Sequence, residues 1–162
     1  MYKSYEAVSD EELAELKQLS EEVIFKPATG WNRRCGANKD KVMSRYNVAK
    51  WFDWKHAQRE LFRTKFPEPI QTKILQGWFL DIPRGTGFLD LMDYWVGKPN
   101  SGTVVITALR DQTIYIDRKE IHVRPGQQLG FNLQQLHEIK PSKEGQLWAC
   151  VMFLGCPMQL KD

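Results

Sequence analysis

Cations and aromatic rings alternate through residues 26–73 of this 162-residue chain. The segment carries a net charge of +8, whereas residues 1–25 carry −5 and residues 74–162 are neutral. Cations neutralise phosphates and aromatic faces stack on bases, so this mixture suits single-stranded nucleic acid or a nucleotide. Trp, Tyr and Arg are also the usual anchors of protein interfaces. The residues predicted to make such contacts are Trp31, Arg33, Arg34, Arg45, Trp51, Trp54 and Arg59.

The same segment also has a structural interpretation, which stays open beside the first. The Trp and Phe side chains could cover the open end of a β-rich body while the Lys and Arg side chains face solvent. Of the three histidines, His56 lies in this segment, His122 lies shortly before Pro125-Gly126, and His137 directly precedes a break between a strand and a turn. This position makes His137 the histidine best suited to chemistry.

Short strands rich in β-branched and aromatic residues fill residues 103–154. Pro, Gly, Asn or Ser interrupt them about every eight to twelve residues, as in antiparallel sandwiches and barrels. The predicted strand segments are Thr103–Thr107, Thr113–Ile116, Glu120–Val123, Leu129–Phe131, Leu136–Pro141 and Leu147–Phe153. Two further strands are predicted upstream, at Ile74–Ile82 and Phe88–Val96.

Helices are predicted in the first part of the chain. Ser9 is a candidate N-cap followed by acidic residues, and apolar residues then recur at helical spacing as far as about Phe25. A second helix is predicted from about Trp54 to Lys65, ending before Pro67-Glu-Pro69. The expected fold is α+β in one domain, with residues 1–70 mainly helix and loop and residues 71–157 forming the β core.

Composition limits the classes of protein that fit. The sequence is 42% hydrophobic and 27% charged, with no apolar run long enough to span a membrane and no signal-peptide core at the N-terminus. Its three cysteines, Cys35, Cys150 and Cys156, form no CxxC pair, which favours a reducing compartment. Cys150 lies within an apolar strand and is predicted to be core, and Cys35 to be exposed.

Several motifs together resemble the double-stranded β-helix of Fe(II)/2-oxoglutarate-dependent oxygenases. The resemblance is strongest to the prolyl-hydroxylase-like branch of that family. They are Gly87-Phe-Leu-Asp-Leu-Met-Asp-Tyr, Gly102-Thr-Val-Val-Ile-Thr-Ala-Leu, Val123-Arg-Pro-Gly-Gln-Gln-Leu-Gly-Phe and Leu136-His-Glu-Ile-Lys-Pro-Ser-Lys-Glu-Gly. The resemblance covers residues 74–154 and implies N-terminal helices packed on an antiparallel, jelly-roll or cupin-like double-stranded β-helix. The cupin family explains less, because its early His-x-His is missing.

The resemblance implies a metal site that is incomplete in this chain. It places Asp93 and His137 at two ligand positions of the facial triad, but Leu91 stands where the first histidine is expected. The arginine that binds the far carboxylate of 2-oxoglutarate falls near Gln146 or Leu147, and neither can form a bidentate pair with a carboxylate. One histidine and one carboxylate would hold ferrous iron weakly.

Three hypotheses about function follow. The first is an oxygenase-like protein that has lost its iron triad and serves as a binding or structural component, with a protein partner or assembly and no cofactor. Its compactness suggests a viral or phage protein, in the cytoplasm or a virion. The second is an active oxygenase using Fe(II) and 2-oxoglutarate with a nonstandard third ligand. The third is a nucleic-acid-binding protein that uses residues 26–73.

Overall fold

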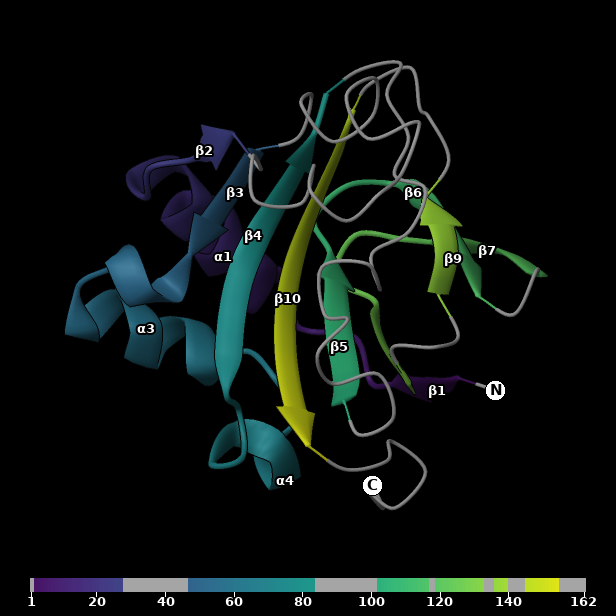
Figure 1. Cartoon of the computed structure of the whole chain (residues 1–162), viewed down its shortest axis with the longest axis horizontal. Coiled ribbons are helices and arrows are strands. Elements are labelled where there is room, and N and C mark those ends of the chain that lie inside the picture. Colours follow the sequence, from purple (N-terminus) through teal and green to yellow (C-terminus); the bar gives the residue numbers. More distant parts are fainter. Residues whose placement is uncertain are drawn as a thin grey trace.

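Two antiparallel sheets and a layer of helices make up the described part of the molecule (Figure 1). The computed structural model describes residues 2–27, 47–83, 102–116, 119–132, 136–139 and 145–154. The helical elements are α1 (Asp10–Glu22), the 3-10 turn η4 (Trp51–Asp53), α3 (His56–Arg63) and α4 (Glu68–Gln71). The strands are β1 (Lys3–Tyr5), β2 (Lys26–Pro27), β3 (Asn47–Lys50), β4 (Gln76–Ile82), β5 (Gly102–Ala108), β6 (Gln112–Ile116), β7 (Lys119–Val123), β8 (Gln128–Asn132), β9 (Leu136–Ile139) and β10 (Gln146–Leu154).

Strand β10 lies at the centre of the large sheet. That sheet has the order β1-β8-β5-β10-β4-β3-β2, and the small sheet has the order β7-β6-β9. Strand β10 pairs along its length with both β4 and β5. Strands far apart in the sequence therefore lie side by side, and the two sheets face each other as in a jelly roll.

Alternate residues of the large sheet enter two different hydrophobic clusters. On β10, Trp148 and Cys150 belong to an inner core shared with the small sheet, whereas Ala149 and Val151 belong to an outer core beneath the helices. This follows from the two-residue period of a strand. The inner core consists of Val48, Trp78, Leu80, Ile82, Val104, Ile106, Ala108, Ile114, Ile116, Val123, Leu129, Phe131, Trp148, Cys150 and Met152.

Helices α1 and α3 cover the outer face of the large sheet (Figure 1). Leu16 and Leu19 of α1 are almost completely buried there, together with Phe62 of α3. The Phe62 ring is the centre of an aromatic group, with ring centroids 5.0 Å from Trp54 and 5.2 Å from Phe79. These contacts fix the helical layer on the sheet, because aromatic side chains bury large apolar areas.

The predicted start of the first helix is confirmed. Ser9 is the N-cap of α1, and its side chain accepts a hydrogen bond from the Glu12 backbone N–H at 3.1 Å. The Glu12 carboxylate accepts in turn from the Ser9 backbone N–H, which completes a capping box. The second predicted helix also exists, as α3, and the prediction that Cys150 is core is confirmed.

Two strands in the first half differ from the sequence-based prediction. Strand β1 pairs with β8 at one edge of the large sheet, and β3 pairs with β4 near the other. Both are too short for a two-residue alternation to be recognised in the sequence. The predicted strand Phe88–Val96 and Cys35 lie outside the described residues. No helix in the described part of the chain is long and apolar enough to cross a membrane.

Gly77 permits the close approach of two aromatic rings to β4. It is paired regularly with Val151, so β4 continues through this position without a change of register. A Cβ atom at Gly77 would lie 2.9 Å from Phe62 Cε1 and 2.9 Å from Trp51 Cε3. Both rings belong to packed, buried side chains that cannot move away freely.

Substituting Gly77 with alanine is therefore expected to lower the free energy of unfolding by about 1–3 kcal/mol, the cost of overpacking a core. Urea unfolding of Gly77→Ala measures this loss, with the neighbouring Gln76→Ala as the control. Equal unfolding midpoints for Gly77→Ala and the wild type would contradict the packing described here.

Candidate functional site

The interior between the two sheets is where the resemblance places a metal and a cosubstrate. Gln146 at the start of β10 is 1% exposed and belongs to this interior side, since the next inward residue is Trp148. Leu147 packs instead against the outer core. Of the two residues proposed for the arginine position, Gln146 is thus the one that faces inward.

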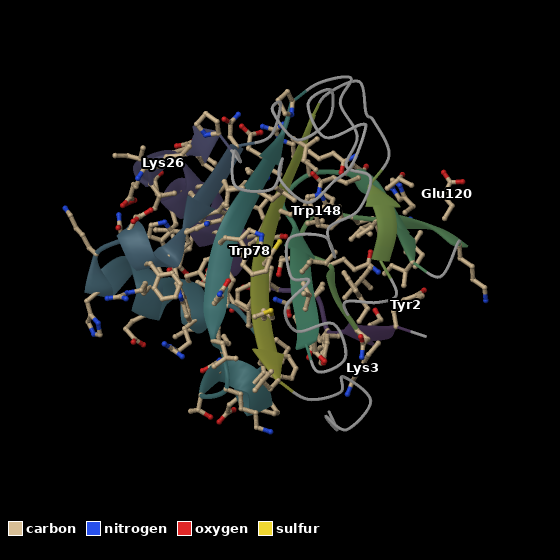
Figure 2. The ribbon with its side chains drawn as sticks, viewed as in Figure 1. Tyr2, Lys3, Lys26, Trp78, Glu120 and Trp148 are labelled. Atoms are coloured by element: carbon tan, nitrogen blue, oxygen red, sulfur yellow. The ribbon has the colours of Figure 1, made fainter. Side chains whose placement is uncertain are left out.

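Gln146 is engaged with its neighbour on the same strand. Its Oε1 accepts a hydrogen bond from Trp148 Nε1 at 3.0 Å, and both side chains are about 1% exposed. Trp78 on β4 is 2% exposed and lies beside the same strand, paired with Cys150. Figure 2 labels both indoles on these neighbouring strands. Two tryptophans and a neutral amide therefore fill this part of the interior.

A second buried glutamine, Gln112 at the start of β6, forms a hydrogen bond with the backbone of β10. Gln112 is 2% exposed, and its Oε1 accepts a hydrogen bond from the backbone N–H of Leu147. The Leu147 carbonyl accepts from Leu109 N at 3.0 Å. Among the described residues, Gln112 Nε2 has no hydrogen-bond partner. Sequence reasoning did not identify Gln112, because a single Gln at the start of a strand carries no signal of burial.

Two groups on the central strands β4 and β10 have perturbed pKa values. Burial raises the pKa of the Asp81 carboxyl above its ordinary value, and the positive charge of Arg110 opposes that shift. Burial also raises the pKa of the Cys150 thiol well above its ordinary value. Cys150 therefore stays protonated and behaves as a small apolar side chain, since the thiolate is the reactive form.

The described residues bring no set of metal ligands together. They contain no group of three or more His, Cys, Asp or Glu side chains placed to hold an ion. His137 lies on β9, which pairs with β6, while Asp93 and Leu91 lie outside the described residues. His122 forms an exposed pair with Asp111, with its Nε2 2.6 Å from Asp111 Oδ1. The prediction of Asp93 and His137 as metal ligands therefore stays a prediction.

The structure places three of the residues predicted to bind nucleic acid or a partner. Trp51 and Trp54 are 4% and 7% exposed and pack beneath α3 on the outer face of the large sheet, and Arg59 is half-buried. Rings buried in this way offer no face on which a base could stack. The expectation that aromatic residues cover the open end of the β body is corrected for this pair: they cover a sheet face. The other predicted residues, Trp31, Arg33, Arg34 and Arg45, lie outside the described residues.

Comparison with known proteins identifies the fold. No family model and no curated protein matches the sequence. Among solved structures, HygX from Streptomyces hygroscopicus, with nickel, 2-oxoglutarate and hygromycin B bound, gives a TM-score of 0.67 at 10% identity, covering 94% of this chain and 82% of that one. A prolyl-4-hydroxylase from Pseudomonas putida gives a TM-score of 0.60 at 12% identity over 94% and 91%.

A third similar structure is a prolyl hydroxylase from Trichoplax adhaerens in complex with a peptide fragment of the hypoxia inducible factor oxygen degradation domain. It gives a TM-score of 0.60 at 12% identity, covering 98% of this chain and 84% of that one. These similarities confirm the predicted fold, helices packed on the double-stranded β-helix of 2-oxoglutarate-Fe(II) oxygenases. At such low identity the similarity concerns the fold, and the chemistry has to be judged from the residues present.

Proposed function

We propose that this protein uses an oxygenase-like double-stranded β-helix as a binding or structural scaffold and does not carry out iron- and 2-oxoglutarate-dependent chemistry. The observation that supports the proposal is Gln146. It is buried at the position where the resemblance expects an arginine, and its amide oxygen is already hydrogen-bonded to Trp148.

The described interior does not fit 2-oxoglutarate. The far carboxylate of this dianion would enter surroundings made of apolar side chains and two neutral glutamines, Gln112 and Gln146. A carboxylate taken out of water needs a cation and further hydrogen bonds, and without them desolvation costs several kcal/mol. A glutamine amide supplies dipoles but no charge, so binding of 2-oxoglutarate is disfavoured.

The residues expected to hold iron do not fit either. Leu91 has no atom that can coordinate a metal, which leaves Asp93 and His137 as two of the three ligands of a facial triad. Two ligands hold ferrous iron weakly. We therefore propose that a protein partner or an assembly, and not iron and 2-oxoglutarate, is the functional counterpart of this chain.

Metal analysis of the purified protein tests this proposal. After expression in iron-supplemented medium, we expect well under one iron per chain, with the same content in His137→Ala as in the wild type. About one iron per chain that is lost in His137→Ala would overturn the proposal in favour of an active oxygenase with a nonstandard ligand.

A further inference from the structure

A cavity of about 670 Å³ lies on the outer side of the large sheet. Residues 5–9 line one part of it and residues 64–67 another, and Gln128 of β8 also contributes. Small-molecule sites in proteins usually have volumes of about 300–1,000 Å³, so this cavity has the size of a ligand site.

The large sheet separates this cavity from the interior of the β-helix. On β8, Leu129 and Phe131 point into the inner core, so Gln128 and Gly130 face the opposite side. Tyr5 covers Gly130 so closely that a Cβ atom there would lie 2.7 Å from Tyr5 Cε2. An inference about the cavity therefore does not depend on what the inner core binds.

Gln128 presents an unused acceptor at the cavity. The residue is 3% exposed, and its Nε2 donates to the Lys65 carbonyl oxygen at 2.7 Å and to Thr107 Oγ1 at 2.9 Å. A carbonyl oxygen can only accept, so the contact with Lys65 fixes which end of the amide is nitrogen. Gln128 Oε1 accepts no hydrogen bond from the described residues. Gln128 Oε1 is not one of the fully buried unpaired atoms of the described residues, so a ligand or water can reach it and donate a hydrogen bond to it.

The charges around the cavity favour a cation. Lys65 is 7% exposed, and its Nζ lies 3.0 Å from Glu15 Oε1, so its positive charge is compensated. The other two charged residues in the cavity lining are Glu6 and Glu12. The lining therefore has a net negative charge beside the unpaired amide oxygen of Gln128.

We propose that this cavity binds a small organic cation that combines N–H donors with an apolar body, such as a primary amine. The ammonium group donates to Gln128 Oε1 and is attracted by the carboxylates of Glu6 and Glu12. The apolar body packs against Phe66 and Ile70, which are 3% and 0% exposed and also line the cavity. Neither the acceptor nor the negative charge suits an anionic ligand.

Three probes of matched shape test the charge requirement. Calorimetric titration with 2-phenylethylamine is expected to give a dissociation constant of about 1 mM or tighter. The anion 3-phenylpropionate and the neutral 3-phenylpropanol are expected to bind at least about tenfold more weakly, which corresponds to the loss of one charge-assisted hydrogen bond. Affinity for the amine should fall as salt is raised, because salt screens the carboxylates.

Matched variants locate the site. Ala7→Trp places a large ring at an exposed lining position and is expected to abolish amine binding, whereas Ala14→Trp on the exposed surface of α1 is expected to leave it unchanged. Glu6→Gln is expected to weaken binding about threefold to tenfold, the range for one partly screened charge. Glu21→Gln, an exposed substitution away from the cavity, is the control for that change.

Several results would overturn the inference. They are no binding of the amine in the millimolar range, equal binding of the alcohol or the anion, or unchanged binding in Ala7→Trp. Circular dichroism of each variant, compared with the wild type and the surface controls under the same conditions, detects loss of folding separately from loss of binding. None of these outcomes bears on iron content, so failure here and failure of the proposed function are distinguishable.

Discussion

Replacement of Phe62 by alanine is expected to lower the free energy of unfolding by about 3–5 kcal/mol. The Phe62 side chain is 0% exposed and contacts the rings of Trp51, Trp54, Phe66 and Phe79. Its removal leaves a cavity that four packed rings cannot fill. Guanidinium unfolding monitored by tryptophan fluorescence measures the loss.

Phe52→Ala is the matched control for this prediction. It removes the same side chain ten positions earlier, where the ring is 63% exposed, so its effect is expected to stay within about 0.5 kcal/mol. Equal losses in the two variants would mean that the aromatic layer beneath α3 is not the packed structure described here.

Replacement of Trp148 by alanine is also expected to lower the free energy of unfolding by about 3–5 kcal/mol. This side chain lies in the inner core, on the opposite side of the large sheet from Phe62. The indole is 1% exposed in the inner core, opposite Leu80 on β4 and Ala108 on β5. Its loss opens the interior where the resemblance places the cosubstrate. Thermal and chemical unfolding of the variant measure the effect.

Trp148→Phe separates packing from hydrogen bonding at this position. It keeps a ring in the interior and removes the hydrogen bond from Nε1 to Gln146 Oε1. We expect a loss of about 1–2 kcal/mol, the usual cost of depriving a buried polar atom of a partner. A loss as large as that of Trp148→Ala would contradict this expectation, because it would mean that the retained ring contributes no packing energy at this position.

Much of the architecture could be predicted from the sequence. A Ser followed three residues later by a Glu is the sequence pattern of a capping box, and Ser9 and Glu12 form one at the start of α1. The β-branched segments after Thr103 became strands because turn residues separate them at regular intervals. The similarity of their order to the oxygenase β-helix predicted the fold correctly, although sequence identity to the similar structures is only 10–12%.

The positions of single side chains could not be predicted in the same way. The sequence left Gln146 and Leu147 as equal candidates for the missing arginine, since strand register decides which of two neighbours faces inward. The partly buried ion pair of Lys65 with Glu15 joins residues 50 positions apart, and no local sequence pattern predicts such a contact. The cavity beside Gln128 also depends on long-range packing.

The basic aromatic segment shows why composition alone was ambiguous. Trp51 and Trp54 enter the outer core, while cations of the same segment such as Lys26 and Lys55 remain exposed. Both arrangements give the same alternation of cations and rings in the sequence. Burial, which only the folded chain reveals, distinguishes a layer that covers a sheet from a surface that stacks on bases.

Anaerobic titration with ferrous iron and 2-oxoglutarate tests the central claim most directly. A working site of this fold produces a weak visible charge-transfer band when both are bound. We predict that no such band appears, because Leu91 and Gln146 stand where a metal ligand and an anion-binding arginine are needed. A band that saturates with both additions and disappears in His137→Ala would contradict this account.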